Sequence, residues 1–424
     1  MTNAAFDQAL QLHQAGRFAE AESLYRKALA IDPQQAMAQI SLGILLYQTG
    51  RLEEAVTASR QGLVLNPKSF EACNTLGITL SALGRHDEAL AAYSQSLTIQ
   101  PNNATVYYNA AASLNRLGKR DQAAAALRRA IGLKPDFAEA MINLGHALVE
   151  SGQLEEAAAI LKKALTISPN SAEALNILGK SQKDLGQIEE ARATLQRAIS
   201  LRPDFAQAQN TLGNVLMVMG RLPESLKAYR RAVELDPQNL TTYSNLIFAM
   251  NFDPSFEPAT ILSEARKWDQ IHGRAPQHFI PPHSNAPDPD RRLRIGYVSP
   301  DFRQHVVAWN LLPLLQHHDP AKVEVFCYSS TTHVDTMTDR IRAHAHHWLD
   351  VSALNDEQVA SKIRQDQIDL LIDLSLHSSG NRLGAFAMAP APVQITYLGY
   401  CGTTGMAAMN YRLSDPHLDP PEMD

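Results

Sequence analysis

Two residues four positions apart, Asp301 and His305, have the types and the spacing that acid–base chemistry needs. If their segment is helical, this spacing places both side chains on one face. A carboxylate beside an imidazole can then take a proton from a hydroxyl group, which is the role of a general base. The alternative is structural, because an Asp that caps a helix and a partly buried His would have the same spacing.

Two further polar segments follow apolar runs in the same region. Ser375, His377 and Ser378 come after the run IDLLIDL, and residues 398–405, LGYCGTTG, come at the end of the run VQITYL. In an open parallel sheet the loops after the carboxyl ends of the strands meet at one edge, where ligands bind. If these runs are strands, the three polar segments form one site.

The chain from residue 293 onward has the alternating elements that such a site requires. Four short runs, LRIGYV, KVEVFCYS, IDLLIDL and VQITYL, are rich in strand-forming residues, and residues 335–345 and 355–366 between them are helical in pattern. Strands that alternate with helices form a parallel sheet. We therefore predict that residues 293–424 form one Rossmann-like α/β half domain.

The preceding part of the chain is a repeat with a period of 34 residues, which is typical of tetratricopeptide repeats. Glycine and proline each recur seven times in one register: Gly16, Gly50, Gly84, Gly118, Gly152, Gly186 and Gly220, with Pro33, Pro67, Pro101, Pro135, Pro169, Pro203 and Pro237. Glycine ends the first helix of each repeat and proline stops the second. Stacked hairpins of this kind predict a right-handed α-helical superhelix, sealed by a helix over residues 241–250.

Asparagines on the first helices of the repeats are candidates for binding a polypeptide. Asn109, Asn143 and Asn245 share one repeat position, and a side-chain amide can both donate to and accept from a peptide backbone. Three other asparagines, Asn74, Asn176 and Asn210, come one residue earlier, about 100° round the helix. The ladder is therefore broken, and the alternative that these are ordinary repeat residues stays open.

Three domains follow from these patterns: a repeat superhelix over residues 1–252, a linker over 253–292 and the half domain over 293–424. The spacing of Ile261, Ala265 and Trp268 predicts an amphipathic helix over residues 257–272 within the linker. Five prolines in residues 276–292 then mark the domain boundary.

Composition excludes several classes of protein. The 424 residues carry a net charge of −6 without a basic stripe, which argues against nucleic acid, and no apolar run is long enough for a membrane span. The three cysteines, Cys73, Cys327 and Cys401, suit neither a disulfide framework nor a zinc site, so we expect a reducing, cytoplasmic location. The histidines of residues 344–347 lack converging partners, and we predict no metal.

The motifs of the second half resemble a known family. LRIGYVSPDFRQH, KVEVFCYS, IDLLIDLSLHSSGNR and APAPVQITYLGYCGTTG, after seven tetratricopeptide repeats, are similar to the bacterial SPINDLY-type protein O-linked N-acetylglucosamine transferases. The resemblance implies a two-lobed, GT-B-like glycosyltransferase without a metal. Such an enzyme moves N-acetylglucosamine from UDP-GlcNAc to Ser or Thr hydroxyls with inversion, while the repeats present the acceptor protein.

The resemblance also implies residue roles. His305 matches a pocket histidine beside donor and acceptor, Asp301 matches a carboxylate that assists deprotonation, and Leu398, Gly399 and His377 fall in segments that contact donor or acceptor. Many bacterial members have Gly-His-Thr where this chain has Leu376-His377-Ser378, and Pro in place of Cys401. Because plant relatives that transfer fucose share the same blocks, the sugar stays open between N-acetylglucosamine and fucose.

An adaptor is the competing interpretation. Family members continue into a second lobe that holds the nucleotide, and this sequence ends at HLDPPEMD. We therefore expect residues 1–424 by themselves to bind acceptor proteins without transferring sugar. A non-catalytic repeat adaptor that carries a remnant lobe would have the same sequence features.

Overall fold

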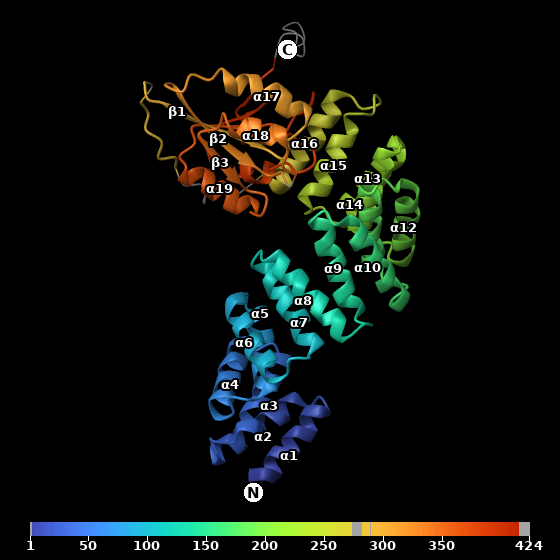
Figure 1. Ribbon diagram of the computed structural model, residues 1–424, viewed down its shortest axis with the longest axis vertical. Helices are drawn as coiled ribbons and strands as arrows, with labels where there is room; N and C mark the ends of the chain where they lie inside the picture. The colour runs from blue at the N-terminus through green and yellow to red at the C-terminus, as the bar shows by residue number, and fades with distance from the viewer. Residues whose placement is uncertain (1, 274–281, 289, 332, 415–424) are drawn as a thin grey trace. The chain divides into compact units, whose positions relative to one another are not determined.

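A computed structural model describes residues 2–273, 282–288, 290–331 and 333–414. Contacts divide the chain into two compact units, Met1–Glu190 and Ala191–Asp424, and the elements of each are labelled in Figure 1. The predicted fold class is confirmed, since paired helices are followed by a parallel sheet with helices. Among the described residues, no helix is long and apolar enough to cross a membrane.

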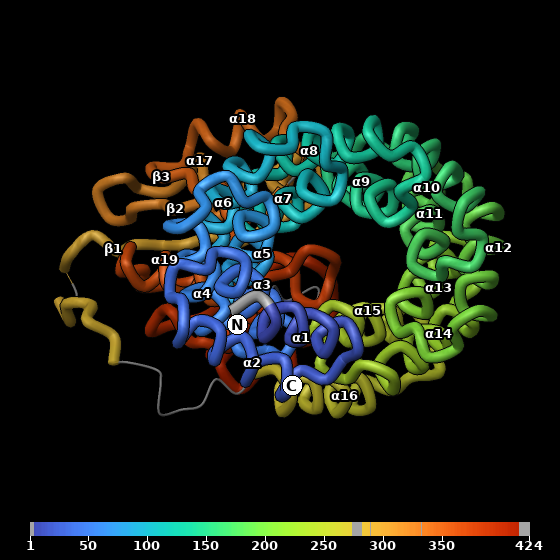
Figure 2. The backbone as a smooth tube through the Cα atoms, turned by 90° about the horizontal axis from the view of Figure 1, so that it is seen from below, coloured from blue at the N-terminus to red at the C-terminus, as the bar shows by residue number. Residues whose placement is uncertain are grey.

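The first unit consists of antiparallel helix pairs, which lie side by side in Figure 2. Its helices are α1 (Thr2–Gln14), α2 (Phe18–Ile31), α3 (Ala36–Gln48), α4 (Leu52–Leu65), α5 (Phe70–Ala82), α6 (His86–Ile99), α7 (Ala104–Arg116), α8 (Arg120–Leu133), α9 (Ala138–Glu150), α10 (Leu154–Ile167) and α11 (Ala172–Asp184), and α12 (Ile188–Leu201) spans the division between the units.

Glycine serves the repeats in two ways. The seven periodic glycines, Gly16 to Gly220 in steps of 34, all have positive φ between 70° and 77°, a conformation that costs glycine nothing and ends the first helix. Inside the helices, Gly77 permits close packing, because a Cβ there would lie 2.5 Å from the ring of Tyr93. Both observations explain why the sequence period predicts the hairpins so well.

The second unit joins the end of the repeats to the sheet. It contains α13 (Ala206–Val218), α14 (Leu222–Leu235), α15 (Leu240–Met250) and α16 (Pro258–His272), followed by β1 (Leu293–Ser299), α17 (Val306–Gln316), β2 (Val323–Ser329), α18 (Thr336–Arg342), β3 (His347–Asp350), α19 (Asp356–Gln365), β4 (Leu370–Asp373), α20 (Leu383–Ala387), β5 (Val393–Thr396) and β6 (Tyr411–Arg412). The predicted helices over 241–250 and 257–272 are confirmed as α15 and α16.

All six strands are parallel, in the order β3-β2-β1-β4-β5-β6. The register pairs Ser299 with Ser329, and it pairs Asp373 with both Val298 and Thr396. Polar residues that end four strands are therefore aligned at one edge of the sheet. This edge positions the loops in which the sequence predicts catalytic and binding residues.

One apolar core is shared by the last repeat and the sheet. Buried side chains of α14, α15 and α16, among them Tyr229, Ile247 and Trp268, belong to the same cluster as Phe326 and Leu371 of the strands. The indole Nε1 of Trp268 also donates to the carbonyl of Leu240, at 3.3 Å. The predicted division at residue 252 falls inside this unit, and α16 packs against α15 and against α20 of the lobe.

Candidate functional site

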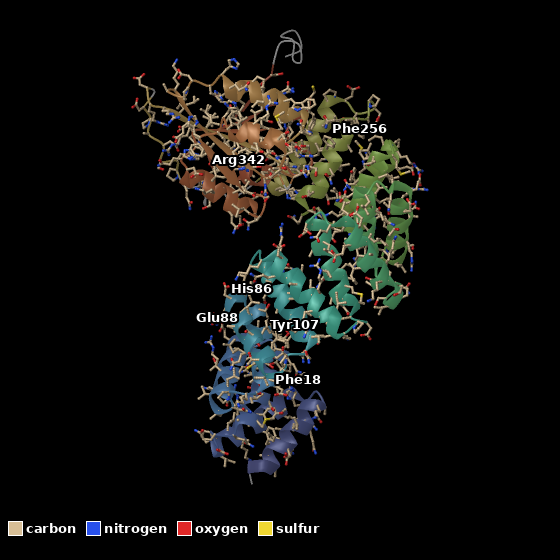
Figure 3. The ribbon with its side chains drawn as sticks, viewed as in Figure 1. Phe18, His86, Glu88, Tyr107, Phe256 and Arg342 are labelled. Carbon is tan, nitrogen blue, oxygen red and sulfur yellow. The ribbon has the colours of Figure 1, made fainter. Side chains whose placement is uncertain are left out.

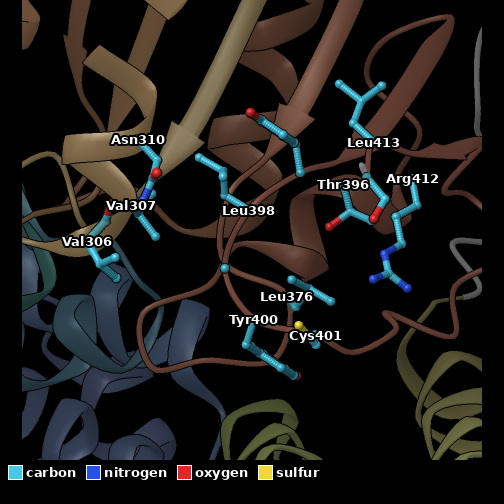
Figure 4. Close-up of a pocket in the computed structure, with 13 residues that line it drawn as sticks. Val306, Val307, Asn310, Leu376, Thr396, Leu398, Tyr400, Cys401, Arg412 and Leu413 are labelled. Atoms are coloured by element: carbon cyan, nitrogen blue, oxygen red, sulfur yellow. Dashed lines mark hydrogen bonds between the residues drawn. The ribbon is translucent and has the colours of Figure 1, made fainter. Parts of the chain in front are cut away.

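A pocket of about 400 Å³ lies at the carboxyl edge of the sheet. In Figure 4, Leu398 and Leu376 lie between Val306 and Val307 on one side and Arg412 on the other. The lining comes from the start of α17 and from the loops after β4, β5 and β6: Val306, Val307, Asn310, Leu376, Thr396, Tyr397, Leu398, Gly399, Tyr400, Cys401, Arg412, Leu413 and Ser414. Arg412 is the single permanent cation in this described lining.

The backbone of the pocket wall is strained. Leu376 and Leu398 have φ of 48° and 58°, values at which residues with a side chain cost about 1–3 kcal/mol. Gly399, with φ 74°, lies so close to Leu376 that a Cβ would be 2.6 Å from its Cδ1. Strain of this kind persists where surrounding contacts determine the conformation, and it concentrates at binding sites. Leu398 and Gly399, both predicted site residues, line this wall.

Asp301 and His305 lie beside the pocket but in a loop instead of a helix. Residues 301–305 precede α17, and His305 is the N-cap of that helix. Asp301 is 8% exposed, and its Oδ2 lies 3.8 Å from His305 Nδ1, while its Oδ1 lies 3.2 Å from Arg303 Nη2. Neither Asp301 nor His305 lines the pocket, although Val306 and Val307 do. The loop, and not a helical face, brings the two side chains together.

The hydrogen bonds of His305 fix where its proton is. Its Nδ1 accepts the backbone N–H of Val307 at 3.3 Å, so in the neutral ring the proton is on Nε2. In this state Nε2 is a donor. For Nε2 to act as a base, the ring proton must instead be on Nδ1, where it needs a hydrogen-bond acceptor. The carboxylate of Asp301, 3.8 Å from Nδ1, is the nearby acceptor. The cap of α17 is therefore His305 and not Asp301, and the two side chains of the predicted dyad lie 3.8 Å apart.

Asp373, a buried carboxylate that the sequence analysis did not single out, is hydrogen-bonded to two residues of the pocket lining, Leu376 and Thr396. It ends β4 and is 1% exposed. It accepts hydrogen bonds from the backbone N–H groups of Ser375 and Leu376 and from the Thr396 hydroxyl, at 3.1, 2.9 and 2.9 Å. Burial raises its pKa to about 6. These bonds hold Leu376 in its strained conformation, and the only sequence signal was an acidic residue at the end of an apolar strand.

His377 does not line the pocket. It is fully buried, its Nδ1 lies 3.1 Å from Ser244 Oγ on α15, and its Nε2 lies 3.0 Å from the carbonyl oxygen of Thr404. Burial lowers its pKa to about 4. The expectation that His377 contacts donor or acceptor therefore differs from its position here, because both ring nitrogens are already bonded within the protein.

The three predicted clamp asparagines differ in their surroundings. Asn109 lines a hollow of about 340 Å³ with Ile78, Ser81, Ala82, His86, Tyr93, Ala112 and Arg116, and His86 is labelled in Figure 3. The Nδ2 of Asn143 donates to the Tyr108 hydroxyl at 3.2 Å. In the second unit, Asn245 Nδ2 donates to Asn210 Oδ1 at 2.9 Å. The amide of Asn109 has no hydrogen bond within the described residues, so it is the best placed to bind a ligand.

Within the described residues, no three His, Cys, Asp or Glu side chains converge as metal ligands do. Two of the clustered histidines have protein partners instead. His346 Nδ1 accepts the Val325 N–H at 3.1 Å, and His347 Nε2 lies 2.8 Å from Glu324 Oε1.

Helical repeats joined to a parallel sheet with a pocket at its carboxyl edge define a class, the repeat proteins with a Rossmann-like lobe. Residues 267–424 match the model of glycosyl transferase family 41. Three tetratricopeptide models match residues 12–76, 79–118, 114–215 and 206–239. The chain therefore combines a tetratricopeptide array with a segment that is similar to glycosyl transferase family 41.

Named relatives agree with this assignment. The chain is 34% identical over 190 residues to SPINDLY of Arabidopsis thaliana, a probable UDP-N-acetylglucosamine–peptide N-acetylglucosaminyltransferase, covering 44% of this chain and 21% of that protein. It is 41% identical over 131 residues to SEC of the same plant, covering 31% and 13%. The chain thus spans about a fifth or less of the length of these curated relatives.

A solved structure covers more of the chain. A mutant O-GlcNAc transferase of Thermobaculum terrenum is 37% identical, with a TM-score of 0.63, over 68% of this chain and 55% of that one. The resemblance to SPINDLY-type transferases that the motifs indicate is confirmed by these matches.

Proposed function

We propose that this chain takes part in transferring N-acetylglucosamine from UDP-GlcNAc to Ser or Thr hydroxyls of proteins that its repeats bind. The pocket at the carboxyl edge carries the proposal, because its wall contains Leu398 and Gly399 of the segment that matches family 41, and because Val306, the residue after His305, also lines it. The relatives named above are peptide N-acetylglucosaminyltransferases, which supports the same donor and the same kind of acceptor.

In the proposed reaction the acceptor oxygen bonds to the anomeric carbon as the bond from that carbon to UDP breaks. The acceptor proton leaves with a base, and UDP leaves with the electron pair. His305 is the proposed proton acceptor through Nε2, after Nδ1 releases the Val307 N–H and the ring proton moves from Nε2 to Nδ1, where it is shared with Asp301. The strained backbone at Leu398 and Gly399 is the proposed sugar contact, because glycine lets a ligand approach the main chain closely.

The proposed acceptor site is the hollow that Asn109 lines. Its free amide can donate to and accept from an extended backbone, each bond contributing about 1 kcal/mol. Asn143 and Asn245 can join after exchanging their present partners, Tyr108 and Asn210. Asn109 should therefore contribute more than either.

The leaving diphosphate sets a further condition. Its charge must be stabilised by hydrogen-bond donors or cations, and the described pocket lining contains one permanent cation, Arg412. Our proposal therefore includes the expectation that residues 1–424 alone bind acceptor without transferring sugar. It also includes transfer without a metal, in the cytoplasm, with no role for nucleic acid or membrane. Activity that EDTA abolishes would contradict the metal-free part.

Cys401 offers a direct test in the intact gene product. It lines the pocket and is exposed, whereas Cys73 and Cys327 are buried and serve as internal controls. We expect UDP-GlcNAc to slow the alkylation of Cys401 by N-ethylmaleimide several-fold, as measured by peptide mass spectrometry, and Gly399→Val, which fills the pocket, to abolish this protection. Protection by GDP-fucose alone would favour fucose transfer. Acceptor binding without protection by either nucleotide sugar would favour the adaptor.

A further inference from the structure

The loop that forms much of the pocket wall, residues 398–405, is packed against two helices that precede the sheet. We call it the pocket loop. The ring of Tyr400 lies edge-on to Phe248 of α15, with centroids 5.2 Å apart. Gly405 meets α16 so closely that a Cβ there would lie 2.5 Å from Ala265 Cβ. The loop therefore rests on α15 and α16 as well as on the sheet.

His377 lies at the centre of these contacts. A backbone carbonyl can only accept, so the bond to Thr404 requires the proton on Nε2, and Nδ1 then accepts the Ser244 hydroxyl proton. The imidazole also lies edge-on to the Trp268 indole of α16, with centroids 5.1 Å apart and planes at 81°. One ring thus contacts α15, α16 and the pocket loop in a single tautomer.

The backbone of His377 adds a fourth contact. Its N–H lies 3.3 Å from the Tyr400 hydroxyl oxygen, which places it against the residue that follows Gly399 in the pocket wall. None of Ser244, Trp268 or His377 lines the pocket, so none is available to touch a ligand there. Any effect of these residues on the pocket must pass through the loop.

We propose that His377 is a positioning residue that holds the pocket loop against α15 and α16, so that the helices closing the repeat array set the shape of the sugar-facing wall. The expected effect on KM rests on the proposed function, whereas the expected effect on the conformation of the pocket loop does not. The helix α15 belongs to the same apolar cluster as Leu226 and Tyr229 of the last repeat. A shift of that repeat therefore has a contiguous route to the loop.

The decisive variant is Ser244→Ala, which removes one hydroxyl on α15 and leaves the pocket lining intact. It should leave Nδ1 of His377 unpaired and speed hydrogen–deuterium exchange of the amides of residues 398–405 about fivefold to tenfold. Ser225→Ala is the matched control, because this buried hydroxyl also donates one bond, to the Gly213 carbonyl at 2.8 Å, away from the loop. It should leave loop exchange unchanged.

Variants of His377 separate positioning from mere packing. His377→Phe keeps a ring against Trp268 but leaves the Thr404 carbonyl without a donor, so loop exchange should rise and the KM for UDP-GlcNAc should increase with a smaller change in kcat. His377→Gln restores a donor toward Thr404 and should recover most of both values. If Ser244 acts through His377, adding Ser244→Ala to His377→Phe should change loop exchange no further.

Loop exchange that is the same in Ser244→Ala and wild type would overturn this role. An additional increase from Ser244→Ala in the His377→Phe background would do the same. If loop exchange responds as expected while the intact wild-type gene product neither binds nor uses UDP-GlcNAc, the proposed function fails and the positioning role stands.

Discussion

Acidification should act on the second unit through two buried groups whose effects oppose each other. His377 is fully buried and its pKa is lowered to about 4 by loss of solvation, whereas Asp373 is 1% exposed and its pKa is raised to about 6 for the same reason. Their usual values in unfolded chains are about 6.5 and 3.9. Between pH 6.5 and 4 the unfolded chain binds a proton at His377 that the folded chain does not, so the free energy of unfolding falls.

Asp373 has the opposite sign. Below pH 6 the folded chain binds a proton there that the unfolded chain takes up only near pH 3.9, so the free energy of unfolding rises as pH falls. From these pKa values, a change from pH 7 to pH 5 lowers the free energy of unfolding by about 2 kcal/mol through His377 and raises it by about 1 kcal/mol through Asp373. The wild-type protein should therefore lose only about 1 kcal/mol from the two groups together.

Urea unfolding followed by tryptophan fluorescence measures this difference, because all three tryptophans, Trp268, Trp309 and Trp348, lie in the second unit. Each variant is compared with itself at pH 7 and pH 5. His377→Gln should lose the acid sensitivity or reverse it, and Asp373→Asn should become about 1 kcal/mol more acid-sensitive than wild type. Equal pH dependence in wild type and His377→Gln would refute the reasoning from burial.

Three other changes have distinct expected outcomes. Asn109→Ala should weaken binding of an acceptor protein about fivefold, measured by calorimetry, and Asn143→Ala should weaken it less because Asn143 already bonds Tyr108; equal losses would contradict a special role for Asn109. Gly399→Ala should destabilise the second unit by about 1–3 kcal/mol in urea unfolding, since it combines positive φ with a contact to Leu376. Where the intact gene product transfers sugar, His305→Ala should lower turnover about 10²-fold or more, while loss of its N-cap bond should lower the free energy of unfolding by only about 1 kcal/mol; wild-type turnover would reduce His305 to a helix cap.

The repeats could be predicted from the sequence almost to the residue, because glycine at positive φ and proline mark every helix end in one register. The sheet was predicted in part. Four strands have dense apolar runs, but β3 contains a histidine and an aspartate in four residues, and β6 has only two residues, Tyr411 and Arg412. Such strands are defined by their neighbours in the sheet and not by their own composition.

The site, too, was predicted only in part. The order of strands and loops was enough to place residues 398–405 at the carboxyl edge, and the structure puts Leu398 and Gly399 in a pocket wall there. His377 could not be assigned in this way, because its burial depends on Ser244 and Trp268, which are more than 100 residues earlier in the chain. The loop conformation of Asp301 to His305 was equally hidden, since helical and capping geometries share one spacing.

The core shared by α14, α15, α16 and the sheet has a consequence for how such proteins are assembled from modules. Repeats that contact only other repeats can be duplicated, deleted or exchanged as interchangeable pieces, because each new neighbour presents the same surface. The last repeat has a different neighbour, since buried residues of α14, α15 and α16 share one apolar cluster with Phe326 and Leu371 of the strands. The last repeat and the lobe must therefore be kept together as one unit when repeats are exchanged. Chimaeras that graft a foreign array onto this lobe should therefore be joined upstream of α13, where the surface to be matched is one repeat against another.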